Sequence, residues 1–169
     1  MQKEYSREEK IAWLAAQPRK PLSGKVLVFN EQGETLLVRP NYKPGWDIVG
    51  GMLNEAESPL QGAIREIKEE IGHELPAERF GFLGVRYGIS QESKGDFVHF
   101  IFKLSLTQGE IAEIVLEETE ILEAQWVAPA EAKELLEGNL RQILSRMLDG
   151  EAGIYSENDQ LVLGGSNAA

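Results

Sequence analysis

Three glutamates, Glu66, Glu69 and Glu70, lie close together in a segment whose residue types favour a helix. Residues three and four apart are neighbours on a helix, so this spacing stacks like charges and destabilises the helix by roughly a few tenths of a kcal/mol per pair. A divalent cation would relieve the repulsion, because hard cations prefer carboxylate oxygens. The spacing therefore predicts a divalent-metal site. The alternative is a solvated acidic face paired with neighbouring basic side chains.

A longer pattern surrounds these glutamates in residues 51–73: Gly, five residues, Glu, seven residues, Arg-Glu, an aliphatic residue, any residue, Glu-Glu, any residue and Gly. This pattern resembles the Nudix box of the MutT-like Nudix hydrolase family. It departs at the last position, where His73 stands in place of a large aliphatic residue. The subfamily is not identifiable. The matching positions are Gly51, Glu57, Arg65, Glu66, Ile67, Glu69, Glu70 and Gly72.

The resemblance implies a Mg²⁺ site, with Mn²⁺ as a substitute, in which Glu66 and Glu70 bind the metal directly, Glu69 lies beside them and Gly50 adds its carbonyl oxygen. Magnesium is typically held by one or two carboxylates plus substrate phosphates. Such a cation bridges phosphate oxygens and lowers the pKa of water, so that hydroxide can attack phosphorus. Hydrolysis of a nucleoside diphosphate linked to another moiety X is the implied reaction. A degenerate Nudix domain that senses nucleotides, or an acidic helix in an unrelated α/β protein, are the alternatives.

Other residues have supporting roles by the same resemblance. Arg65 is expected to pair with Glu57 and to fix the orientation of the metal ligands. The general base is expected to be Glu69, with Glu120 in the acidic segment before a later strand as the second candidate. Gly51 is expected to supply backbone freedom.

Substrate contacts are harder to assign. Arg39 and Trp46 flank a loop before the box, and with Gly51 they are candidate substrate-binding residues. Surface solubility is the alternative for Arg39, and core packing for Trp46. Residues 90–94 open like the motif of NADH-type pyrophosphatases but do not continue it. ADP-ribose, dinucleoside polyphosphates, oxidised nucleotides and nucleotide sugars all stay open as substrates.

Composition narrows the class of protein. The chain has 169 residues, enough for one domain with a core, and its 42% hydrophobic and 27% charged residues are typical of a soluble globular protein. The net charge of −11 argues against nonspecific nucleic-acid binding, which needs a basic face. No apolar run approaches the ~18 residues of a membrane span, and the first residues lack the layout of a secretory signal. We therefore expect a cytoplasmic protein with a small-molecule substrate; a homodimer is expected by analogy alone.

The elements that must position this site alternate between strands and helices, which predicts an α/β protein with a Nudix-type α/β/α sandwich around a mixed β-sheet. We expect one Nudix domain over residues 1–148 and a C-terminal tail over 149–169, which holds a small hairpin or is irregular, and then frays. The expected helices cover residues 6–17, 59–71 and 129–147. The expected strands cover residues 24–30, 34–39, 46–49, 80–87, 96–106 and 121–127, with an irregular acidic segment at 107–120.

Overall fold

A mixed sheet of eight strands forms the centre of the computed structural model, which describes residues 4–89, 95–158 and 160–164. The strand order is β6-β2-β1-β5-β4-β7-β8, with β3 paired to β1 away from this path. The β1–β5 and β4–β7 pairs are parallel and the others antiparallel. The strands are β1 (Leu22–Phe29), β2 (Thr35–Pro40), β3 (Val49–Met52), β4 (Gly81–Ile89), β5 (Asp96–Ser105), β6 (Ile121–Val127), β7 (Ile154–Glu157) and β8 (Gln160–Leu163).

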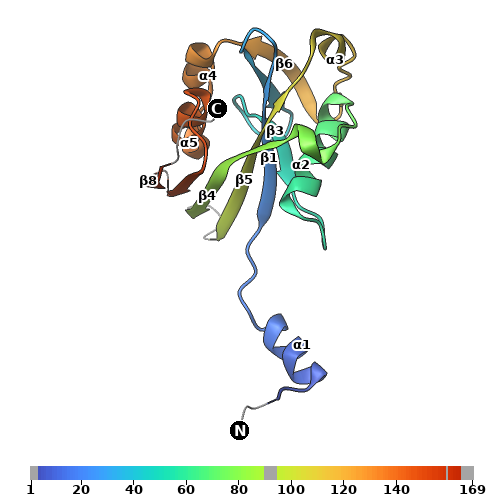
Figure 1. Ribbon diagram of the computed structural model, residues 1–169, viewed down its shortest axis with the longest axis vertical. Helices are drawn as coiled ribbons and strands as arrows, with labels where there is room; N and C mark the ends of the chain where they lie inside the picture. Colours follow the sequence, from blue (N-terminus) through green and yellow to red (C-terminus); the bar gives the residue numbers. More distant parts are fainter. Residues whose placement is uncertain (1–3, 90–94, 159, 165–169) are drawn as a thin grey trace.

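Helices cover both faces of this sheet, as Figure 1 shows: α2 lies on one side and α4 and α5 lie on the other. The helices are α1 (Arg7–Ala15), α2 (Pro59–Ile71), α3 (Gln108–Ala112), α4 (Pro129–Leu135) and α5 (Arg141–Leu148), with short 3₁₀ turns η1 (Ala77–Arg79) and η2 (Gly138–Leu140). The predicted α/β/α sandwich around a mixed sheet is confirmed.

Two apolar clusters separate the layers, and β1 contributes to both because successive side chains of a strand point to opposite faces. Val26 and Val28 pack in the cluster that holds the apolar stripe of α2. Leu27 packs in the other cluster, against residues of α4 and α5 such as Leu136 and Leu144. Successive side chains of β5 divide in the same way, since Phe102 joins the first cluster and Ile101 the second.

Several elements differ from the sequence prediction. The single helix expected over 129–147 is two helices, because the backbone is extended at Leu136 and Glu137, and Gly138 then adopts a positive φ of 67° before α5. The segment 107–120, expected to be irregular, contains α3. The strand expected at 46–49 begins only at Val49, although Trp46 and Asp47 each make an isolated bridge.

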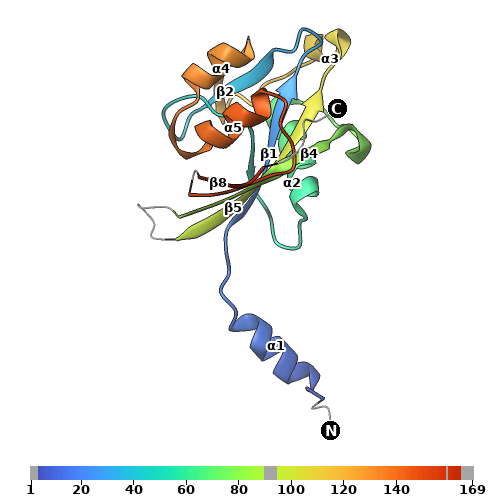
Figure 2. The same cartoon turned by 60° about the vertical axis from the view of Figure 1, so that its left-hand side comes forward.

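The two ends of the chain are also placed. Helix α1 stands away from the sandwich in both Figure 1 and Figure 2, and it contains no buried residue. In the tail, β7 and β8 form an antiparallel hairpin, and β7 adds to the sheet beside β4. The fraying expected at the last residues, like the interrupted motif at 90–94, lies outside the described residues. Within the described parts of the chain, no helix is long and apolar enough to cross a membrane.

Candidate metal and substrate site

Helix α2, which carries the three glutamates, is fixed at both ends by its own sequence. The Ser58 hydroxyl accepts from the Gln61 N–H at 3.3 Å, while the Gln61 side chain accepts from the Ser58 N–H at 2.9 Å, so the N-terminus has a complete capping box. Pro59 occupies the first turn, and Gly72 ends the helix in the left-handed conformation with φ 83°. The apolar stripe of Ala63, Ile67 and Ile71 is buried against the sheet. The glutamates are therefore held at a fixed rotation about the helix axis.

Glu66 and Glu70 lie at the edge of that stripe and are almost buried, at 7% and 6% exposure. The Gly50 N–H of β3 lies 3.4 Å from both carboxylate oxygens of Glu70. A Cβ on Gly51 would lie 2.5 Å from Glu66 Oε1, so the missing side chain is what lets this carboxylate lie against β3. Gly51, a candidate substrate-binding residue, therefore also has a structural role, because it leaves room for the Glu66 carboxylate.

The two buried carboxylates repel each other. Burial and then the negative charge of Glu66 raise the pKa of Glu70 to about 7. Burial likewise raises the pKa of Glu66, although the Arg65 guanidinium opposes this. Desolvation and a nearby like charge both disfavour the ionised form, so this pair lacks sufficient positive charge from the protein itself.

Arg65 connects the remaining acids of the box. Its Nε and Nη2 donate to Glu57 at 2.8 and 3.0 Å, which is the pairing that the sequence predicted. Its Nη1 donates to Glu66 at 2.7 Å and to Glu69 at 2.6 Å, and Nη2 also donates to the Met52 carbonyl oxygen. One planar guanidinium therefore ties the helix to the loop before it, in the fork geometry that suits carboxylates.

Glu69 differs from its neighbours because its side chain is 54% exposed. Glu120, the second candidate base, is exposed in the segment before β6, and its charge is among those that raise the pKa of Glu66. The Asn41 N–H donates to the Glu120 carbonyl oxygen at 2.8 Å. The structure therefore brings Glu120 and the β2–β3 loop to the same side as the box glutamates.

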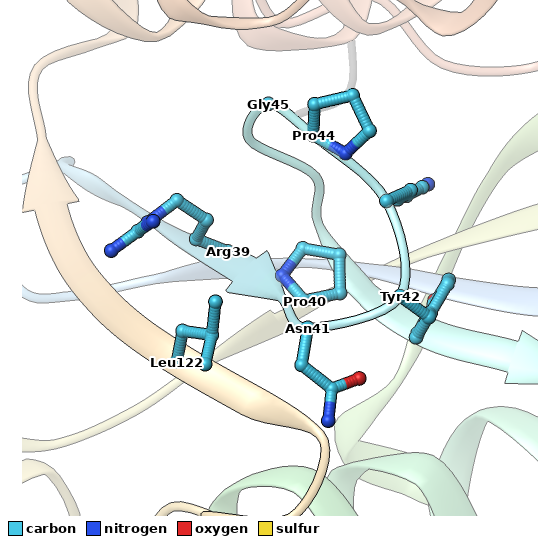
Figure 3. A pocket seen from close by; sticks show the side chains of 8 residues that line it. Arg39, Pro40, Asn41, Tyr42, Pro44, Gly45 and Leu122 are labelled. Carbon is cyan, nitrogen blue, oxygen red and sulfur yellow. The ribbon is translucent and has the colours of Figure 1, made fainter.

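The other candidate substrate residues have different surroundings. Arg39 donates from Nε and Nη2 to Glu123 at 3.1 and 2.8 Å on the surface. Trp46 is half-buried and packs against the apolar cluster under α4 and α5, so core packing accounts for at least part of this side chain. A hollow of about 470 Å³ lies around the β2–β3 loop. Figure 3 shows side chains that line it, with Arg39 and Leu122 on one side of Pro40 and Tyr42 on the other. Among the candidate substrate residues, Arg39 lines this hollow from the end of β2, whereas Trp46 lies in the connection to β3 outside its lining.

Sequence reasoning missed a buried ion pair beside the site. Lys25 Nζ of β1 donates to Asp47 Oδ2 at 2.9 Å, and Lys43 donates to the same oxygen at 2.5 Å. Burial alone would raise the pKa of Asp47, but the two ammonium groups lower it to about 2. A signal was present, because Lys25 is a charged residue within the otherwise apolar run of β1.

The carboxylate oxygens of Glu66 and Glu70 are chemically suited to bind a divalent cation. Within the described ranges, no group of three or more His, Cys, Asp or Glu side chains is placed so that it could hold a metal ion. The oxygens of Glu66 and Glu70 form a buried acidic pair instead, whose mutual repulsion a cation would offset. Magnesium suits such a site, since it keeps waters and takes few protein ligands.

Comparison with known proteins places the chain in a family. The model of the NUDIX domain matches residues 20–147. A Bacillus subtilis (strain 168) protein named "Putative 8-oxo-dGTP diphosphatase" is 33% identical over 104 residues, which cover 62% of this chain and 64% of that protein. An RNA pyrophosphohydrolase of Gluconobacter oxydans (strain 621H) is 37% identical over 71 residues, or 39% of this chain and 41% of that protein. The chain thus spans less than two thirds of the length of these curated relatives.

Solved structures agree on the fold. The MutT protein of Methanosarcina mazei Go1 superposes with a TM-score of 0.62 at 25% identity, covering 79% of this chain and 96% of that one. The NUDIX domain of Shewanella oneidensis NrtR, solved with ADP ribose, gives 0.68 at 17% identity and covers 86% and 97%. Since the matched region includes the whole box, the unrelated-protein alternative is excluded. The chain belongs to the NUDIX domain family.

Proposed function

We propose that this protein is a Mg²⁺-dependent Nudix pyrophosphohydrolase that cleaves the phosphoanhydride bond of a nucleoside diphosphate linked to another moiety. The observation that carries the proposal is the pair of nearly buried carboxylates, Glu66 and Glu70, in which burial and then the charge of Glu66 raise the pKa of Glu70 to about 7. Such a pair costs stability unless a cation sits beside it. The chain has this costly acidic pair and belongs to the NUDIX domain family. Together these two facts support a catalytic site at the pair.

The box residues have distinct proposed roles. Glu66 and Glu70, with the Gly50 carbonyl oxygen, would hold Mg²⁺ or Mn²⁺, which when bound neutralises phosphate charge and makes water a better nucleophile. Arg65 acts on the ligands rather than on substrate, because its guanidinium already donates to five oxygens of four residues. Glu69, exposed beside the pair, is the proposed base that removes a proton from the attacking water, and Glu120 is the second candidate.

The β2–β3 loop is proposed to bind the substrate's nucleoside or its moiety X. It joins the Glu120 segment through the Asn41 N–H and surrounds the hollow that Arg39 and Tyr42 line. Because the protein carries a net charge of −11, an anionic substrate needs local positive charge. Arg39 at the end of β2 and Lys43 on the loop line the hollow and are the proposed source of that charge, with the substrate competing against Glu123 for Arg39 and against Asp47 for Lys43.

The test is hydrolysis by the full chain of a panel of compounds in Mg²⁺ or Mn²⁺, with products identified by mass. The panel holds 8-oxo-dGTP, dGTP, ADP-ribose, a dinucleoside polyphosphate and a nucleotide sugar. We expect metal-dependent turnover of at least one compound, loss with EDTA, and recovery on adding Mg²⁺. Running the reaction in ¹⁸O-labelled water shows which phosphorus is attacked.

Variants assign the roles. Glu70→Gln should lower kcat by about 100-fold or more with the fold intact, as loss of a metal ligand does. Glu69→Gln and Glu120→Gln identify the base, since the variant that removes it loses the fall in rate on the acid side of the pH–rate profile. Exposed Glu118 provides the matched control, because Glu118→Gln changes one charge in the same acidic segment.

A nucleotide sensor is the second proposal, and the intact contacts of Arg65 with Glu57, Glu66 and Glu69 speak against it. Binding of a panel compound without turnover of any would favour the sensor. A cytoplasmic location and a homodimer stay predictions.

A further inference from the structure

The ion pair between Lys25 and Asp47 is almost dry, with the two side chains only 8% and 7% exposed. Asp47 is held from several directions: its Oδ2 accepts from Lys25 and Lys43, its Oδ1 accepts from the Ile48 N–H at 2.8 Å, and its backbone exchanges two hydrogen bonds with Val38. Burying two charges is costly, and removing one partner leaves the other charge buried and uncompensated.

This pair lies next to the acidic pair of the box. Lys25 of β1 is the register partner of Gly50 of β3, whose N–H faces the Glu70 carboxylate. The two backbones are so close that a Cβ on Gly50 would lie 2.7 Å from the Lys25 Cα. The ammonium of Lys25 is within electrostatic reach of Glu70, since its charge helps to lower the pKa of that carboxyl.

A buried ammonium in this place opposes a divalent cation at Glu66 and Glu70. Asp47 cancels its charge, while the contact with Asp47 also fixes where the ammonium lies. Resting on the proposed function, we propose that Asp47 is a positioning residue for the metal site: it holds and neutralises the Lys25 ammonium so that the site keeps its net negative charge. The Lys25–Asp47 pair thus sets the cation affinity of the site through its charge, without contacting the metal.

Variants of Asp47 and Lys25 distinguish the proposed electrostatic role from a merely structural one. A structural salt bridge loses stability when either partner changes. An electrostatic role instead predicts opposite effects on cation binding, because Asp47→Asn leaves an extra positive charge and Lys25→Met removes one. The double variant removes both charges and should restore binding.

The experiment measures Mn²⁺ binding to the full chain by electron paramagnetic resonance, which needs no substrate and no turnover. Even at the dielectric constant of water, a unit charge about 10 Å from a divalent ion changes its affinity by roughly threefold or more. We therefore expect Asp47→Asn to raise the Kd for Mn²⁺ at least about threefold, and Lys25→Met to bind at least as tightly as wild type. The double variant should return to within about twofold of wild type.

Lys43→Met is the matched control, because Lys43 contacts the same Asp47 oxygen but its side chain is 42% exposed, so solvent screens its charge. Circular dichroism and urea unfolding establish that each variant is folded. If Asp47→Asn does not fold, the Mn²⁺ affinities of Lys25→Met and of the double variant are compared with that of wild type instead.

Three results overturn the inference: Asp47→Asn binding Mn²⁺ like wild type, the double variant binding as weakly as Asp47→Asn, or Lys25→Met binding more weakly than wild type. Wild type that binds no Mn²⁺ would overturn the proposed function and this inference together. If wild type binds Mn²⁺ and hydrolyses substrate, but Asp47→Asn has an unchanged affinity for Mn²⁺, this inference is refuted and the proposed function is not.

Discussion

Metal-free protein should lose stability as pH rises through the titration of Glu70. The folded-state pKa of this carboxyl is about 7, against an ordinary 4.5, because burial and then the Glu66 charge disfavour its ionised form. Between these two values the folded state binds the proton more tightly than the unfolded state. Stability from this group is therefore complete below about pH 4.5 and is lost as pH rises to about 7.

The size of the effect follows from the two pKa values. At ~1.36 kcal/mol for each pH unit between them, ionising Glu70 in the folded protein costs about 3 kcal/mol. That is a large fraction of the ~5–15 kcal/mol that holds a typical domain folded. Glu70→Gln removes the titration while leaving an oxygen to accept from the Gly50 N–H, so this variant should lack the corresponding loss.

The assay is urea unfolding in EDTA at pH 5 and pH 8, followed by tryptophan fluorescence, for wild type, Glu70→Gln and the exposed control Glu118→Gln. We expect wild type and the control to lose about 3 kcal/mol more than Glu70→Gln between the two pH values. Saturating Mg²⁺ should reduce the difference. Equal losses in wild type and Glu70→Gln would refute the reasoning that burial and repulsion act on this carboxyl.

Three further changes probe the framework of the site. Arg65→Lys keeps the charge but cannot reproduce the fork to Glu57 and Glu66, so kcat should fall about 10- to 100-fold with little change in KM, as steady-state kinetics would reveal. Gly51→Ala should displace the Glu66 carboxylate, since the new Cβ would lie 2.5 Å from its oxygen, and Mn²⁺ titration should find weaker binding with the fold intact. Ser58→Ala removes the cap of α2 and should lower the free energy of unfolding by about 1 kcal/mol in urea, without a change in KM. These predictions fail if kcat is unchanged in Arg65→Lys, if Mn²⁺ affinity is unchanged in Gly51→Ala, or if the free energy of unfolding is unchanged in Ser58→Ala.

Local patterns accounted for the box. Capping residues, the apolar stripe and the spacing of Glu66, Glu69 and Glu70 all act within one helix, so the sequence alone predicted the bounds of α2. The pairing of Arg65 with Glu57 was predicted by resemblance, and it is present. Helix propensity did not reveal the break between α4 and α5, because neither Leu136 nor Glu137, where the backbone is extended, disfavours a helix, and an isolated glycine such as Gly138 is tolerated in one.

Tertiary contacts were beyond the sequence. Lys25 and Asp47 are 22 residues apart. The charge of Lys25 within β1 indicates a buried partner, but nothing local in either segment indicates that this partner is Asp47, which precedes β3. The closeness of Glu120 to Glu66 likewise depends on the path of the chain after α3. The near burial of Glu66 depends on Gly51 of β3, where a Cβ would lie 2.5 Å from the carboxylate oxygen.

The most direct test of the metal site is an anomalous difference map from crystals grown with Mn²⁺ and a non-hydrolysable phosphoanhydride. The arrangement of α2 against β3 predicts a peak in coordination contact with the carboxylate oxygens of Glu66 and Glu70. A well-ordered ligand in the β2–β3 loop region, with no anomalous peak beside those two carboxylates, would contradict it.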